Sequence, residues 1–112
     1  MTEEKPMTAG KAEMAEAQTE KVDKITANVR IVNKLGLHAR AAAQLVAVAS
    51  QFNASSRLQH EGRQADCKSI ISLLMLAAGQ GAPLTLTVQG QDATAACEAI
   101  AQLIQERFNE GE

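Results

Sequence analysis

Residues 33–43 read NKLGLHARAAA, so a glycine stands between a segment of alternating polarity and an alanine-rich segment. Upstream, residues 26–32 alternate between apolar and polar side chains, as a half-buried strand does. Downstream, residues 39–52 repeat apolar side chains at the three- and four-residue spacing of one helix face. The stretch therefore predicts a strand, a glycine turn and a helix, with His38 at the start of the helix.

His38 and Arg40 are the candidate chemical groups of this turn. The first N–H groups of a helix have no intrahelical acceptor, and with the positive end of the helix dipole they form a site for an anion. The guanidinium of Arg40 adds a planar set of donors that suits phosphate oxygens. Together they predict a histidine that receives a phosphoryl group as neutral imidazole and passes it on. The alternative is a histidine that only caps the helix.

The composition predicts a single small domain with an aliphatic core. The chain has 112 residues, of which 46% are hydrophobic and 2% aromatic. Its formal net charge is -2 and basic residues form no long run, which argues against nucleic acid or an anionic membrane as a partner. No segment has the roughly 18 apolar residues of a transmembrane helix, and the N-terminus lacks the pattern of a signal peptide. We therefore expect a cytoplasmic, monomeric protein whose partners are other proteins.

Residues 1–25 are predicted to be a flexible, charged extension, and residues 26–112 the folded domain. The extension is rich in Glu, Lys, Ala and Thr, and Pro6 and Gly10 interrupt any long helix. Its Ala and Glu content leaves a frayed helix over residues 12–24 as an alternative.

The rest of the chain predicts further strands and helices. Glu61-Gly62 indicates a two-residue hairpin turn between two weakly apolar strands, which we expect near an edge of the sheet. Ser69 should cap a short helix that a glycine near residue 79 terminates, and Asp92 should cap the last helix. The expected elements are strands 26–32, 55–60, 63–67 and 84–88 and helices 39–52, 70–76 and 93–108. This order predicts an α+β domain with a four-stranded sheet covered on one face by helices.

Two motifs in this order, LGLHARAA at residues 35–42 and KSIISLLMLAAG at residues 68–79, resemble those of a known family. The family is HPr, the histidine-containing phosphocarrier protein of the bacterial phosphoenolpyruvate:sugar phosphotransferase system. The resemblance extends over about residues 26–108. It implies an HPr-like open-faced β-sandwich, in which three helices cover one face of a four-stranded antiparallel sheet in the order βαββαβα.

The resemblance also implies a relay of phosphoryl transfer. Enzyme I, phosphorylated by phosphoenolpyruvate, would pass the group to a ring nitrogen of His38, and His38 would pass it to A-type acceptor domains. Arg40 aligns with the family's arginine, whereas Ala41 stands where the family commonly has proline. Proline near a helix start is favourable but not chemically required, so we expect a slightly looser site. Such a carrier is not a stand-alone enzyme and needs no metal or organic cofactor of its own.

Ser69 aligns with the serine that a dedicated kinase phosphorylates in some HPr proteins. A phosphate there would suit the helix N-terminus but would place negative charge beside apolar Ile70, Ile71 and Leu74. Because the run 70–76 holds more apolar residues than one side of a short helix can bury, we expect part of it to form a docking patch for partners near His38.

Two questions stay open at this point. A regulatory module that binds its partner through the Ser69 helix, with His38 vestigial, is the rival function. Within the carrier class, the run LLML also resembles that of nitrogen-branch relatives, so a regulatory acceptor is an alternative to sugar transport. His60 is expected at the surface, Cys97 in the core and Cys67 half-exposed, all three without a chemical role.

Overall fold

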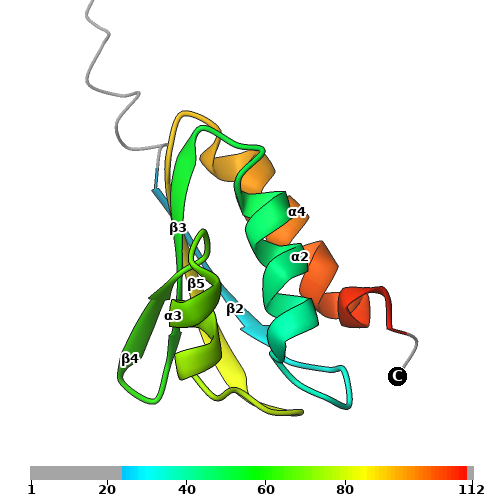
Figure 1. Ribbon diagram of the computed structural model, residues 1–112. Helices are drawn as coiled ribbons and strands as arrows, with labels where there is room; N and C mark the ends of the chain where they lie inside the picture. The colour runs from blue at the N-terminus through cyan, green and yellow to red at the C-terminus, as the bar shows by residue number, and fades with distance from the viewer. Residues whose placement is uncertain (1–23, 111–112) are drawn as a thin grey trace, which may run out of the picture.

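Four antiparallel strands form one sheet in the order β2-β5-β3-β4, and the helices cover one of its faces (Figure 1). The computed structural model of the protein describes residues 24–110. The strands are β2 (Lys24–Arg30), β3 (Ala54–His60), β4 (Arg63–Asp66) and β5 (Pro83–Gly90), and the helices are α2 (Ala39–Ala49), α3 (Ile70–Met75) and α4 (Ala93–Gln105), followed by the short turn η1 (Arg107–Asn109). The α+β architecture predicted from the sequence is confirmed.

The first strand lies two residues earlier than predicted. β2 begins at Lys24 and ends at Arg30, because the register with β5 pairs Lys24 with Gln89 and Arg30 with Pro83. Its alternating burial is nevertheless the expected one, since Ala27 and Val29 point toward the helices. The predicted extension thus loses its last two residues to β2, and Lys24, the last residue of the alternative helix over residues 12–24, lies in this strand. The rest of both predictions lies outside the described residues.

The hairpin between β3 and β4 has the predicted two-residue turn. Glu61 and Gly62 both have positive φ, 51° and 84°, which is the conformation that matches the twist of two adjoining strands. The expectation that both strands lie near an edge is right only for β4. β3 is an interior strand between β5 and β4, and its few apolar side chains are placed inward, with Leu58 fully buried.

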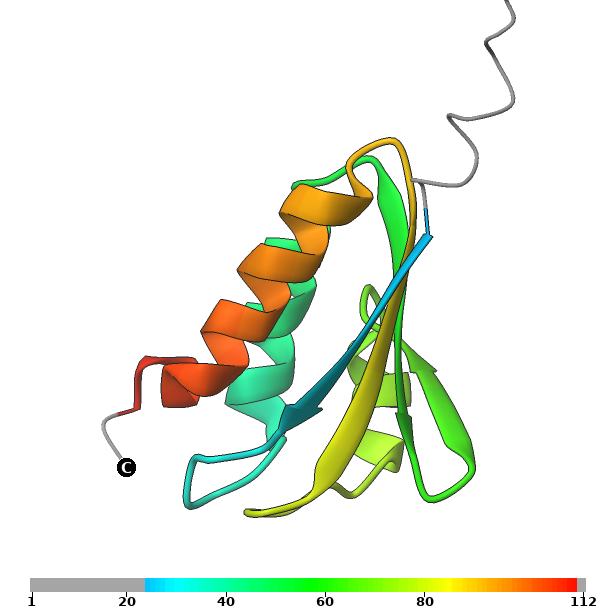
Figure 2. The ribbon, with the colours of Figure 1, turned by 180° about the vertical axis from the view of Figure 1, so that it is seen from behind.

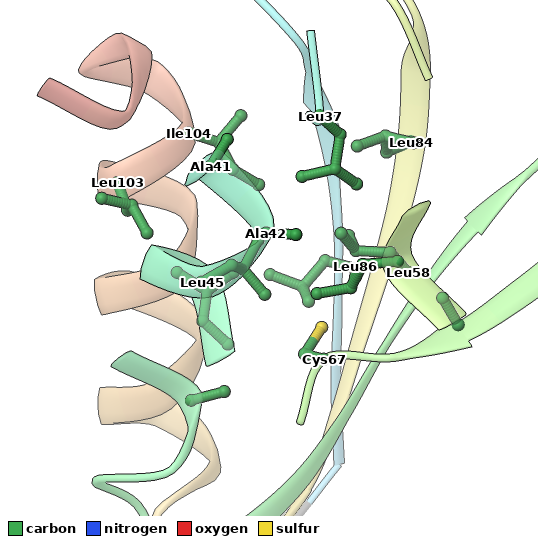
Figure 3. Close-up of a cluster of buried hydrophobic side chains, with 14 of the residues drawn as sticks. Leu37, Ala41, Ala42, Leu45, Leu58, Cys67, Leu84, Leu86, Leu103 and Ile104 are labelled. Atoms are coloured by element: carbon green, nitrogen blue, oxygen red, sulfur yellow. The ribbon is translucent and has the colours of Figure 1, made fainter. Parts of the chain in front are cut away.

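The core lies between the sheet and helices α2 and α4, which run side by side across it (Figure 2). Leu45 of α2 lies near Leu58 and Leu86 of the sheet, and Ile104 of α4 lies beside Ala41 (Figure 3). One stripe of residues is buried from the start of α4 into η1: Ala93, Ala96, Cys97, Ile100, Leu103, Ile104 and Phe108. Ala41, Ala42 and Ala49 of α2 are buried in this core, and α2 contacts α4.

Cys67 is fully buried in this core, so the prediction of a half-exposed thiol is wrong. It follows the end of β4, where its N–H donates to the carbonyl of Ser56 at 2.9 Å. Burial raises the pKa of the Cys67 thiol to about 12, which leaves it protonated and unreactive near neutral pH.

Four helix ends differ from the prediction, and α4 ends at Gln105 rather than at residue 108. α2 ends at Ala49 rather than Phe52, because the chain must turn into β3, and the Asn53 N–H donates to Asp92 Oδ2 at 2.7 Å. Asp92 does stand at the N-cap of α4, but its carboxylate holds this loop instead of capping the helix. The chain leaves α3 through Ala77, whose φ is 53°, and not through a glycine at 79.

None of the described helices has the length and apolarity needed to cross a membrane.

The turn η1 after α4 has an unusual backbone. Arg107, Phe108 and Asn109 all have left-handed φ values, 59°, 52° and 63°. For residues other than glycine this conformation costs roughly 1–2 kcal/mol each, and Asn tolerates it best. The fully buried side chain of Phe108 offsets this cost, because it packs where α4 and α2 meet. The turn directs the chain back toward the start of α2.

Candidate phosphoryl-transfer site

The loop before α2 requires glycine at position 36. Gly36 has a φ of 71°, and a Cβ there would lie 2.7 Å from the carbonyl oxygen of Ala78 and 2.8 Å from Cα of Gly79. The next residue, Leu37, donates its N–H to the same Ala78 carbonyl at 2.9 Å. The segment that follows α3 therefore supports the loop, and the loop delivers His38 to the start of the helix.

His38 is the N-cap of α2. Its backbone is extended, with φ -85° and ψ -178°, and its Nδ1 accepts the N–H of Arg40 at 3.3 Å. The first intrahelical bond runs from the Ala42 N–H to the His38 carbonyl at 2.8 Å, so the N–H groups of residues 39–41 precede it. The ring is partly exposed, at 28% of its side-chain surface. A histidine at the helix start is thus both a cap and an accessible group beside unused donors.

Glu110 and Asn33 complete the site, and neither is among the residues predicted from the sequence. The carboxylate of Glu110 pairs with Nε2 of His38 through Oε2. Through Oε1 it accepts a hydrogen bond from Nδ2 of Asn33 at 3.0 Å, and the same Nδ2 also donates to the Gly36 carbonyl at 2.8 Å. Asn33 is fully buried and immediately precedes the glycine loop. The signal that could have found them is weak: a polar residue in an apolar stretch, and an acid near the C-terminus.

These contacts distinguish the two ring nitrogens of His38. Nδ1 accepts a backbone N–H, so it carries a lone pair, and Nε2 faces a carboxylate, so it carries the proton. The lone pair on Nδ1 points toward the N-terminus of α2. The ring therefore presents the Nδ1 lone pair on the side where a helix N-terminus best stabilises an anion.

Positive and negative groups surround the ring. A hollow of about 250 Å³ is lined by Lys34, Leu35, His38, Arg40, Asn109 and Glu110. Arg40 is exposed on the first turn of α2 and lines the same hollow as His38. The Asn33 hydrogen bond, followed by the His38 bond, holds the pKa of the Glu110 carboxyl below its ordinary value. Glu110 is therefore ionised near neutral pH.

Ser69 caps α3 as predicted. Its backbone is extended, and its Oγ accepts the N–H of Ser72 at 3.2 Å. The apolar run behind it divides in two. Leu73 and Leu76 are buried, whereas Ile70, Ile71, Leu74 and Met75 are 40%, 72%, 39% and 66% exposed. We call these last four residues the α3 patch; α3 packs against α2, the helix that His38 caps.

His60 does not take part in this site. Its side chain is only 11% exposed, contrary to the prediction of a surface residue, because Nδ1 bonds to the Pro83 carbonyl at 3.1 Å. Within residues 24–110 no three His, Cys, Asp or Glu side chains converge as a metal site would require.

The sequence matches a known family over most of the described region. Residues 25–106 match the family described as "PTS HPr component phosphorylation site". The chain belongs to this HPr family. An HPr protein is a phosphocarrier of the phosphotransferase system and not a stand-alone enzyme.

Individual HPr relatives agree with the family match. The phosphocarrier protein HPr of Cupriavidus necator is 49% identical over 82 residues, 73% of this chain and 92% of the relative. The phosphocarrier protein NPr of Shewanella violacea is 45% identical over 87 residues, 78% of this chain and 96% of the relative. The crystal structure of HPr from Thermoanaerobacter tengcongensis superposes with a TM-score of 0.74 at 34% identity, covering 77% of this chain and 97% of that one.

Proposed function

We propose that His38 is the phosphoryl-carrying residue, loaded by enzyme I and discharged to A-type acceptor domains in the cytoplasm. The observation that carries this proposal is the position of its ring, which caps α2 with Nδ1 on the side of the unused N–H groups. The lone pair of Nδ1 would form a bond to phosphorus while the bond from phosphorus to the donor breaks, and its electron pair stays with the donor. Discharge is the reverse step, with the acceptor as nucleophile.

The start of α2 supports the phosphoryl group without trapping it. Once phosphorus occupies Nδ1, the Arg40 N–H can donate to a phosphoryl oxygen instead. The helix dipole and the Arg40 side chain add attraction for the dianion. Because the site is open to solvent, these charges are screened and the binding stays moderate. A carrier needs this balance, since a tightly held group could not move on.

The decisive experiment is to incubate the protein with phosphoenolpyruvate, enzyme I and magnesium, which we expect to serve enzyme I. A phosphate that acid removes is attached to histidine, whereas phosphate on serine survives acid. We expect acid-labile label on His38. A protein that takes no label on His38 here, but takes acid-stable phosphate on Ser69 from a kinase and ATP, would instead favour the rival function of a regulatory module acting through Ser69.

The acceptor has two candidate classes. The identity with HPr from Cupriavidus necator favours the acceptor of a sugar transporter, and the 45% identity with a protein named NPr favours a nitrogen-type regulatory acceptor. Reconstitution with the host's enzyme I and each of its A-type domains would distinguish them by the rate of discharge.

Arg40→Ala should slow phosphoryl transfer by about 10- to 100-fold, because it removes a charged donor from the hollow that His38 also lines. The fold should be unchanged, since Arg40 is exposed on the first turn of α2. The rate of transfer from phosphorylated enzyme I, followed by rapid quench, measures the effect. Arg57→Ala, on the open face of the sheet, is the matched control. Equal rates for the two variants would contradict a role for Arg40.

The α3 patch is the surface that we propose for docking partners, with Ile70, Ile71 and Leu74 as its members closest to Ser69. Its exposed aliphatic side chains lie on a short helix that packs against α2, so a partner seated there would lie beside His38. Phosphate on Ser69 would place about two negative charges at the edge of this patch and weaken docking.

We propose that Ser69 is a regulatory phosphorylation site for an HPr kinase/phosphorylase. Ser69→Ala should abolish any acid-stable mass increase on incubation with such a kinase and ATP. It should also lower the free energy of unfolding by about 1 kcal/mol, because α3 loses its cap. Intact-mass spectrometry and urea denaturation measure the two effects. An unmodified wild-type protein would remove the regulatory assignment.

A further inference from the structure

We propose that Glu110 and Asn33 are positioning residues that fix which nitrogen of His38 attacks phosphorus. This inference rests on the proposed function of His38. Three side chains form a hydrogen-bonded chain: Asn33 orients Glu110, and Glu110 holds the proton on Nε2 of His38. Nδ1 is thereby left as the nucleophile.

The orientation of Asn33 is set by its partners. Both groups that it contacts, the Gly36 carbonyl and Glu110 Oε1, are acceptors, so its NH2 group must face them. Its own Oδ1 is buried and finds no hydrogen-bond partner among the described residues. A buried amide oxygen without a partner is unfavourable. The two hydrogen bonds that the NH2 group donates must therefore hold the Asn33 side chain in this orientation.

The place of Glu110 is built into the fold, although it follows the last helix. The three left-handed residues of η1 turn the chain, and the buried ring of Phe108 anchors that turn. Asn109 Nδ2 also donates to Gln44 Oε1 of α2 at 3.4 Å. The carboxylate therefore meets His38 from a fixed direction, from the side of the ring opposite Nδ1.

The Glu110 carboxylate affects both the loading and the discharge of His38. When Nδ1 bonds to phosphorus, positive charge develops on the ring, and the proton stays on Nε2. The charge of Glu110 stabilises that state, as a carboxylate behind a histidine does in many sites. On discharge, the N–P bond breaks, its electron pair returns to Nδ1, and the proton is still on Nε2. No proton has to move during either step.

Nitrogen NMR of the unphosphorylated, full-length protein tests the first half of the proposal. The ¹⁵N shifts of the His38 ring report which nitrogen carries the proton. If Glu110 had a merely structural role, its substitution would leave these shifts unchanged. We expect a proton on Nε2 in the wild type and a mixture of both forms in Glu110→Ala. Glu110→Gln can still accept from Nε2, so it should retain the wild-type form. Glu106→Gln, an exposed glutamate on the preceding turn, is the control and should change nothing.

Transfer kinetics test the second half. We expect Glu110→Ala and Glu110→Gln to lower the rates of loading and discharge about 10-fold, because both remove the charge. Asn33→Ala should give a smaller loss and raise the pKa of Glu110 toward its ordinary value, which a carboxyl ¹³C titration detects. If Asn33→Ala does not fold, the Glu110 variants decide the question.

The outcomes separate this inference from the proposed function. If the wild-type protein is labelled on His38 and Glu110→Ala has rates within twofold of wild type, the proposed role of Glu110 and Asn33 is wrong, whereas the carrier function of His38 is retained. A proton on Nδ1 in the wild type would lead to the same conclusion. A wild-type protein that takes no label on His38 would overturn both.

Discussion

His38→Asn should incorporate no phosphoryl group from phosphorylated enzyme I, and it should keep the fold of the wild type. The asparagine has no nucleophilic ring nitrogen, so the transfer step is lost completely. Its side-chain oxygen can still accept the Arg40 N–H, and asparagine is among the best N-cap residues. Labelling from phosphoenolpyruvate, with intact-mass analysis, measures the loss. This is the largest functional effect that we expect from one substitution.

The matched control is His60→Asn, which removes the other histidine of the chain. His60 bonds to the Pro83 carbonyl away from the site, so its loss should leave labelling unchanged. Thermal unfolding followed by circular dichroism checks that both variants fold. Acid-labile label on His38→Asn would refute the assignment of His38, whatever its rate of appearance.

Phe108→Ala should lower the free energy of unfolding by about 3–5 kcal/mol. The Phe108 ring is fully buried, and its removal leaves a cavity where α4 and α2 meet. The left-handed backbone of η1 would lose the contact that holds it, so we also expect Glu110 to leave Nε2 of His38. Urea denaturation measures the stability, and the ¹⁵N shifts of His38 report the second effect.

Phe108→Leu is the milder companion to this variant. Leucine refills much of the cavity, so the loss of stability should be about 1 kcal/mol and the contact between Glu110 and His38 should persist. A loss below about 1 kcal/mol for Phe108→Ala would show that the turn is not anchored by this side chain.

The sequence predicted the elements whose single apolar face decides their structure. Leu84, Leu86 and Val88 alternate and are buried as expected, and the stripe of α4 continues to Phe108. Element ends were less predictable, because tertiary contacts set them. The register with β5 places the start of β2, and Ala77 leaves α3 in a conformation that a glycine usually marks.

The candidate site was predictable only in part. The glycine and the histidine lie within one short motif, and the structure places them in one turn. Asn33 and Glu110 are far apart in the chain and meet because of a left-handed turn that contains no glycine. Neither the periodicity of the sequence nor its turn residues indicates such a turn, so the carboxylate behind His38 could be found only from the structure.

The order of the strands has a consequence for synthesis of the chain. β2 is an edge strand, and its one neighbour in the described sheet is β5. The backbone of Lys24 can therefore form its pairing only after Gln89 has been synthesised. Such distant pairing delays folding, because the entropy of closing a long loop is lost before any contact repays it. While the ribosome is still making the chain, β2 and β3 have no strand between them. The histidine loop that follows β2 should therefore take shape only after most of the protein has been translated.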